Sequence, residues 1–212
     1  GCAYKATSGT IPANGRSTQS TAGGGFWGTD KHSDGHTEGN AILHSDRANS
    51  GANAALVRSV GWGSGNTAPS GFGTCQNTTA GELYLGVCQN NSPVYGYTFA
   101  SRPSSLSFYY RYEVVSAGNG DFGTAEISVL DKDGNVIATA DKVLGEQSAY
   151  TLVEMPLTYT SKEKAASLRI IFRSSGFDGA LSNKNTTFWH KPGANNTSGG
   201  EFVGSELYID DV

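Results

Sequence analysis

Short runs of β-branched and aromatic residues, separated by turn-forming residues, fill most of the chain from Ala54 onward. The runs recur at intervals of about ten residues, a spacing that is typical of an all-β sandwich. They cover residues 54–60, 82–86, 94–99, 105–112, 125–130, 136–140, 150–158, 167–174 and 205–212. We therefore expect about nine strands, because the one helical candidate, residues 161–166, is too short to change the fold class.

Two of these runs place an apolar or aromatic residue at every second position. The alternating residues are Leu106, Phe108, Tyr110 and Tyr112 in the first run and Leu168, Ile170 and Phe172 in the second. Side chains alternate between the two faces of a strand, so each run presents one apolar face to a core. The pattern predicts two sheets that pack face to face.

The clearest local unit is a predicted β-hairpin formed by residues 125–130 and 136–140. Its connection contains Asp133 followed by Gly134. An Asp-Gly pair suits a hairpin turn because glycine adopts a positive φ without steric cost. We expect a tight turn at this point.

The composition fits an all-β chain. There are 29 glycines and 6 prolines among 212 residues, and charged residues make up 16%. Glycine in a helix costs about 1 kcal/mol relative to alanine, so this many glycines belong in turns between strands. Hydrophobic residues make up 37%, enough to pack a core. The length predicts a single domain, residues 1–212, in which residues 1–25 form an extended entry segment rich in Gly, Ser and Thr.

The charge and hydropathy pattern excludes two classes of partner. The formal net charge is −4, so the chain has no general attraction to phosphate backbones, and nucleic acid is not an expected partner. No apolar run approaches the 18 or so residues that a membrane-spanning helix needs. We expect the domain to be a monomer, and its cysteines indicate an extracytoplasmic location.

Cysteine usage supports that location. Cys75 and Cys88 enclose a segment rich in Gly and Thr that can turn back and bring the two sulfurs together. A Cys75–Cys88 disulfide would close a loop of about 14 residues. By restricting the unfolded chain, it would stabilise the fold by about 3 kcal/mol. Because the cysteine count is odd, reduced thiols and a pairing with Cys2 are alternatives. Cys2 after Gly1 is also consistent with a lipid anchor, with a tag scar before it, or with an ordinary internal cysteine.

Aromatic residues in loop-like surroundings are the strongest indication of a binding function. Trp27, Trp62 and Trp189 lie in neighbourhoods rich in Gly, Asn or Thr, and Tyr95 adjoins a glycine. Flat rings surrounded by polar donors suit a sugar, whose C–H face stacks and whose hydroxyls form hydrogen bonds. The alternative is that these rings fill the open ends of the sandwich.

No catalytic arrangement emerges from the sequence. There is no G-x-S-x-G nucleophile motif, and no metal-ligand spacing such as C-x-x-C. A glycosidase needs two carboxylates at a defined separation, which sequence alone cannot place among the 19 acids. Two acids, Asp210 and Asp211, follow an apolar strand and must be solvated, cap a turn or bind a cation.

An ordered series of motifs carries a family resemblance. The series comprises residues 25–30 (GFWGTD), 50–57 (SGANAALV), 102–112 (RPSSLSFYYRY), the Asp-Gly-Asn hairpin, and 204–212 (GSELYIDDV). In this order the chain resembles the carbohydrate metabolism domain family, whose members look like carbohydrate-binding modules on bacterial surface lipoproteins. The resemblance covers the chain from about residue 25 to its end.

The resemblance implies a jelly-roll β-sandwich, a secreted, periplasmic or surface-anchored location, and a role in glycan utilisation. It also implies a structural Ca²⁺ with Asp210 as a ligand and Asp30 or Glu38 as its partner. The hypothesis that follows is a non-catalytic glycan-binding module with Trp27, Trp62, Tyr95 and Trp189 as binding residues. A structural or adhesive spacer domain is the main alternative, and a glycoside hydrolase or lyase is the third.

Overall fold

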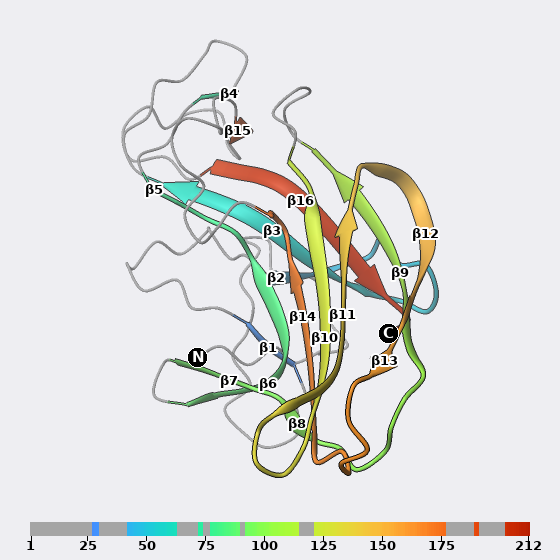
Figure 1. The fold of residues 1–212 in the computed structure, drawn as a ribbon. Helices are drawn as coiled ribbons and strands as arrows, with labels where there is room; N and C mark the ends of the chain where they lie inside the picture. Colours follow the sequence, from blue (N-terminus) through green and yellow to red (C-terminus); the bar gives the residue numbers. More distant parts are fainter. Residues whose placement is uncertain are drawn as a thin grey trace.

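A computed structural model describes residues 27–29, 42–62, 72–73, 77–89, 92–114, 121–176, 189–190 and 202–212. Over these residues the chain is all-β, with two antiparallel sheets that lie face to face (Figure 1). The strands are β1 (Trp27–Thr29), β2 (Ile42–Ser45), β3 (Ala54–Trp62), β4 (Phe72–Gly73), β5 (Asn77–Thr79), β6 (Glu82–Gln89), β7 (Ser92–Tyr95), β8 (Tyr97–Thr98), β9 (Ser105–Glu113), β10 (Gly123–Leu130), β11 (Val136–Leu144), β12 (Gln147–Pro156), β13 (Thr158–Tyr159), β14 (Ser167–Arg173), β15 (Trp189–His190) and β16 (Phe202–Asp210). In the described part of the chain, no helix is long and apolar enough to cross a membrane.

Eight long strands form a jelly roll. The first sheet contains the order β6-β14-β10-β11, extended by β1 next to β6 and by β13 next to β11. The second sheet contains β12-β9-β16, with β3 paired to β16. In chain order the first of the eight pairs with the last (β3 with β16), the second with the seventh (β6 with β14), the third with the sixth (β9 with β12) and the fourth with the fifth (β10 with β11). This nested pairing is the jelly-roll topology, and it confirms the expected fold.

The alternation read from the sequence forms the core. Phe108 of β9 and Phe172 of β14 are both fully buried, and their ring centroids lie 4.9 Å apart in an edge-to-face contact between the two sheets. Ile127 of β10 and Leu207 of β16 belong to the same buried cluster. Burying a side chain of this kind contributes about 1.5–3 kcal/mol, so the facing apolar rows hold the sheets together.

Two predicted strands are divided in the structure. Predicted strand 94–99 breaks at Gly96, whose φ of +101° few other residues adopt, and this separates β7 from β8. Predicted strand 150–158 is interrupted after Pro156, at the junction of β12 and β13. The helical candidate at 161–166 contains no helix. The short strands β1, β2, β4, β5 and β15 were not predicted, because they have too few residues to show a period.

The predicted hairpin turn is confirmed, with Gly134 at φ +84°. The Asp131 carboxylate organises this turn. Its Oδ1 accepts hydrogen bonds from the backbone N–H groups of Asp133 and Asn135, both at 2.9 Å. Its Oδ2 accepts one from the Asn135 side-chain amide at 3.0 Å. These bonds, led by the Asn135 side chain, lower the pKa of Asp131 below its ordinary value of 3.8.

A pH-dependent stability contribution follows. Because the folded pKa is depressed, the contribution is fully present above pH 3.8 and is lost as the pH falls through the lower folded value. Chemical denaturation of the wild type and Asp131→Ala should show a clear stability difference at about pH 6 that narrows towards about pH 2. A difference that stays constant over that range would contradict this role for the carboxylate.

Candidate functional site

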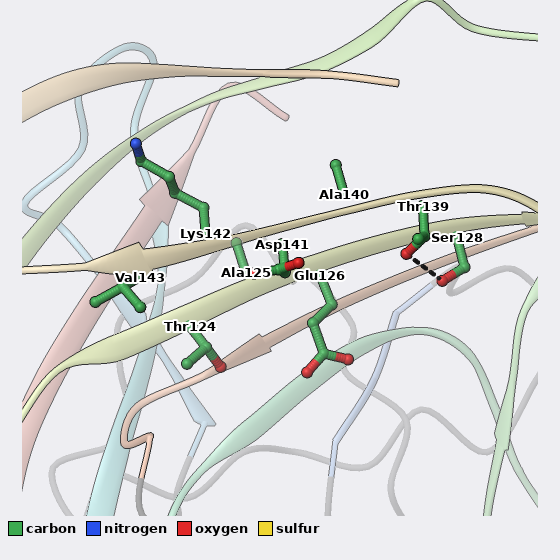
Figure 2. A pocket seen from close by; sticks show the side chains of 9 residues that line it. All are labelled: Thr124, Ala125, Glu126, Ser128, Thr139, Ala140, Asp141, Lys142 and Val143. Carbon is green, nitrogen blue, oxygen red and sulfur yellow. Dashed lines mark hydrogen bonds between the residues drawn. The ribbon is translucent and has the colours of Figure 1, made fainter. Parts of the chain in front are cut away.

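A groove of about 400 Å³ lies on the outer face of the first sheet, over β10 and β11 (Figure 2). Strand alternation places it there, because the odd-numbered residues of β10 from Ala125 to Val129 are buried in the core. The outward side chains that line the groove are Thr124, Glu126 and Ser128 of β10 and Thr139, Asp141 and Val143 of β11. The groove therefore combines hydroxyls, two carboxylates and one exposed apolar side chain on two rigid strands.

The hairpin register arranges these side chains in facing pairs. Glu126 lies directly opposite Asp141, and Ser128 lies opposite Thr139. The hydroxyls of Ser128 and Thr139 lie 3.3 Å apart, within hydrogen-bond distance. Lys142 also borders the groove, but in Figure 2 its side chain extends to the opposite side of the strands from Glu126. Acidic and hydroxyl groups thus dominate the open side of the groove.

An ion-pair network holds Glu126 in place. Arg173 of β14 donates from Nη1 to Glu126 Oε1 at 2.5 Å and from Nε to Glu82 Oε2 of β6 at 2.8 Å. Desolvation lowers the pKa of Arg173, but the two carboxylates outweigh it and raise that pKa. The guanidinium therefore stays charged and ties together three neighbouring strands.

Tyr95, a predicted glycan-binding residue, joins the far end of this network. Its hydroxyl donates to Glu82 Oε1 at 2.6 Å, and its ring contacts Tyr84 edge to face at 4.9 Å. Burial and the bond to Glu82 raise the pKa of Tyr95. The Arg169 guanidinium lies 5.7 Å from the Tyr95 ring centre. Tyr95 is half-buried and covers Tyr84 and Ile171, so it connects to the groove through Glu82 and Arg173.

The backbone places one of the three predicted tryptophans in the first sheet and the other two in the second. Trp27 lies in β1, at the edge of the first sheet. Trp62 ends β3, and Trp189 lies in β15, both in the second sheet. Their side chains lie outside the described residues. The structure therefore does not bring the three together on one sheet, and their roles stay predictions.

Asp210, the predicted calcium ligand, anchors a loop. Its Oδ2 accepts hydrogen bonds from the backbone N–H groups of Asn49 at 2.7 Å and Ser50 at 3.1 Å. Asp211 accepts hydrogen bonds from the Ser50 hydroxyl at 2.6 Å and the Asn49 side-chain amide at 2.9 Å. These two bonds lower the pKa of Asp211. With these contacts, the two acids cap the turn at Asn49 and Ser50.

The calcium site stays a prediction. Asp30 and Glu38 lie outside the described residues. Within the described ranges, no three His, Cys, Asp or Glu side chains are grouped so that they could hold a metal ion.

The side chains of the predicted disulfide lie outside the described part of the chain. Cys88 lies in β6 opposite Pro93 of β7, but its side chain is not described, and neither Cys75 nor Cys2 is. The Cys75–Cys88 bond stays a prediction.

Sequence reasoning missed the groove residues. The signal was present in the hairpin, where the outward positions Glu126, Ser128, Thr139 and Asp141 are all polar. The contact with Arg173 had no such signal, because it depends on pairing between β10 and β14, which are far apart in the chain.

No family model and no curated protein matches the sequence. Among solved structures, a family 11 carbohydrate-binding module from Clostridium thermocellum is similar at 10% identity and a TM-score of 0.36, over 92% of this chain and 95% of the module. A family 22 carbohydrate-binding module of the same organism matches at 12% identity and a TM-score of 0.33, over 94% and 96%. The enzymatically active domain of tailspike protein 4 from bacteriophage CBA120 matches at 11% identity and a TM-score of 0.37, over 86% of this chain and 19% of that one.

Proposed function

We propose that this domain is a non-catalytic glycan-binding module whose binding site is the groove over β10 and β11. The observation that carries the proposal is the set of outward groups on these strands. Glu126 and Asp141 are acceptors for sugar hydroxyls, and Ser128 and Thr139 can both donate and accept. Val143, 57% exposed, offers an apolar contact for C–H groups. A few convergent polar groups beside an apolar one are what a sugar site requires.

Rigid support for these groups favours binding. The groove side chains project from strands rather than loops, and the network through Arg173 fixes Glu126. A site whose polar groups are held in place loses little conformational entropy when a ligand binds.

The proposal extends to the setting of the domain. We place it in a secreted or surface-anchored bacterial protein of glycan utilisation, with Cys2 as a candidate lipid attachment point and Asp210 as a candidate ligand of a structural Ca²⁺.

Calorimetry against a panel of soluble polysaccharides tests the proposal. We expect at least one to bind, and we expect Glu126→Gln and Asp141→Ala each to weaken binding by about tenfold, the equivalent of 1.4 kcal/mol. Glu154→Gln, at an exposed position of β12 in the second sheet, is the matched control and should bind as the wild type does. Thermal unfolding of each variant confirms that the fold is intact.

Two outcomes favour other functions. If no polysaccharide binds, the domain is a spacer, as in the structural alternative. If the bound oligosaccharide is recovered cleaved, the facing carboxylates of Glu126 and Asp141 act as a hydrolytic pair.

A further inference from the structure

The charges around the groove are unevenly matched. Glu126 and Asp141 face each other across the hairpin, and like charges in directly opposite positions destabilise a sheet. Arg173 compensates Glu126. Asp141 is exposed on β11. Strand β10 separates β11 from β14, which carries the arginines. On its β11 side the groove thus presents one exposed carboxylate, that of Asp141.

Two arginines and one lysine lie near the groove, and protein groups engage the arginines. Arg173 uses Nε for Glu82 and Nη1 for Glu126. Arg169 lies opposite Ser128, but its guanidinium contacts the ring of Tyr95, on the other side of β14 from the groove. Lys142 extends to the opposite side of its strand in Figure 2. Among the described residues, Arg173 is therefore engaged by two carboxylates, Arg169 lies against an aromatic ring, and Lys142 points away from the groove.

From this charge arrangement we infer that the groove selects neutral, hydroxyl-rich glycans and rejects uronates, with Asp141 as the residue that determines the selection. This inference rests on the proposed function, because it concerns the ligand class of the same site. A neutral sugar offers hydroxyl donors to both carboxylates. A uronate in the same position brings a third carboxylate next to Asp141, and its repulsion is weakly screened at low ionic strength.

The test uses one polymer in two charge states. Mixed-linkage β-glucan and β-1,4-galactan are the neutral probes, and oxidation of their C6 hydroxyls to carboxylates gives uronates with unchanged linkage. At low salt we expect the oxidised form of a bound polymer to bind about tenfold more weakly than the neutral form. Methyl esterification of the oxidised form removes the charge and should restore most of the affinity.

A variant isolates the role of Asp141. In Asp141→Asn the difference in affinity between the neutral and the oxidised polymer should narrow to about threefold or less. In the wild type, about 0.5 M salt should narrow this difference in affinity similarly. Asp133→Asn is the matched control, because it removes the same charge from an exposed position in the hairpin turn, where Asp133 contacts Lys132. This control should keep the full difference in affinity.

The outcomes separate this inference from the proposed function. If the oxidised polymer binds the wild type as tightly as the neutral one, or if Asp141→Asn leaves the difference in affinity unchanged, the inference is wrong while glycan binding stands. If neither these polymers nor any other polysaccharide of the panel binds, both the inference and the proposed function are wrong.

Discussion

Replacing Gly86 with alanine is expected to destabilise the protein by roughly 3 kcal/mol or more, as backbone strain and a steric clash act together. Gly86 has a φ of +153°, a conformation that other residues rarely adopt. A Cβ atom there would lie 2.2 Å from the carbonyl oxygen of Val94 and 3.1 Å from the Cα of Tyr95. Both atoms belong to the backbone of β7, so the clash cannot be relieved by rotating a side chain.

The Gly86→Ala substitution should also disturb packing on the outer face of the first sheet. Gly86 pairs with Tyr95 in the β6–β7 ladder, and Tyr95 covers Tyr84 and Ile171. Displacement of β7 would expose both residues and break the bond from Tyr95 to Glu82. Urea unfolding measures the stability change, and near-ultraviolet circular dichroism reports the tyrosine environment.

Gly134→Ala is the matched control for this prediction. Gly134 has a positive φ of +84°, but no atom lies within 4 Å of the position of its Cβ. We expect it to cost only about 1–2 kcal/mol, the strain of the backbone alone. If the two variants lost the same amount of stability, the close approach of β7 to Gly86 would make no contribution to the effect of Gly86→Ala.

The second large effect is expected for Arg173→Met, which keeps much of the side-chain volume but removes the charge. It leaves Glu82, whose side chain is only 15% exposed, and Glu126 without their shared partner. A partly buried carboxylate deprived of its counter-charge is costly, and we expect a loss of about 2–3 kcal/mol. Because Glu126 loses its anchor, glycan affinity should fall as well.

Lys132→Met provides the comparison for an exposed ion pair. The side chains of Lys132 and Asp133 are 78% and 62% exposed, so their contact should contribute less than about 1 kcal/mol to stability.

A third experiment adds Arg173→Met to a protein that already carries Glu82→Gln and Glu126→Gln. The substitution should cost less stability there than in the wild type, because no carboxylates are left for Arg173 to compensate. An equal cost in both backgrounds would mean that Arg173 acts through packing alone.

Much of the fold could be predicted because its signals are local. The alternation in 105–112 and 167–174 identifies the inward faces, and Asp133-Gly134 identifies the hairpin turn. The two-sheet architecture follows from these patterns. The order of strands within each sheet depends on contacts between distant segments, such as β3 with β16, and only the family resemblance suggested it.

The candidate site could be predicted less well. The sequence pattern favoured four aromatic residues in loop-like surroundings as sugar-binding residues, but all four lie in strands. Tyr95 uses its ring and hydroxyl to pack against the sheet and hold Glu82. Asp210 bonds to Asn49 and Ser50, which are separated from it by most of the chain. The groove depends on which face of the β10–β11 hairpin is open, and that is decided by the packing of the two sheets.

The central claim is that glycans bind at the groove over β10 and β11. The most direct test is a nuclear magnetic resonance titration of the isotope-labelled domain with oligosaccharides of mixed-linkage β-glucan and β-1,4-galactan. We predict that the largest shift changes fall on the backbone amides of residues 124–128 and 139–143. Shift changes confined to other parts of the molecule, such as β9 and β16 of the second sheet, or no changes with either sugar, would contradict the claim.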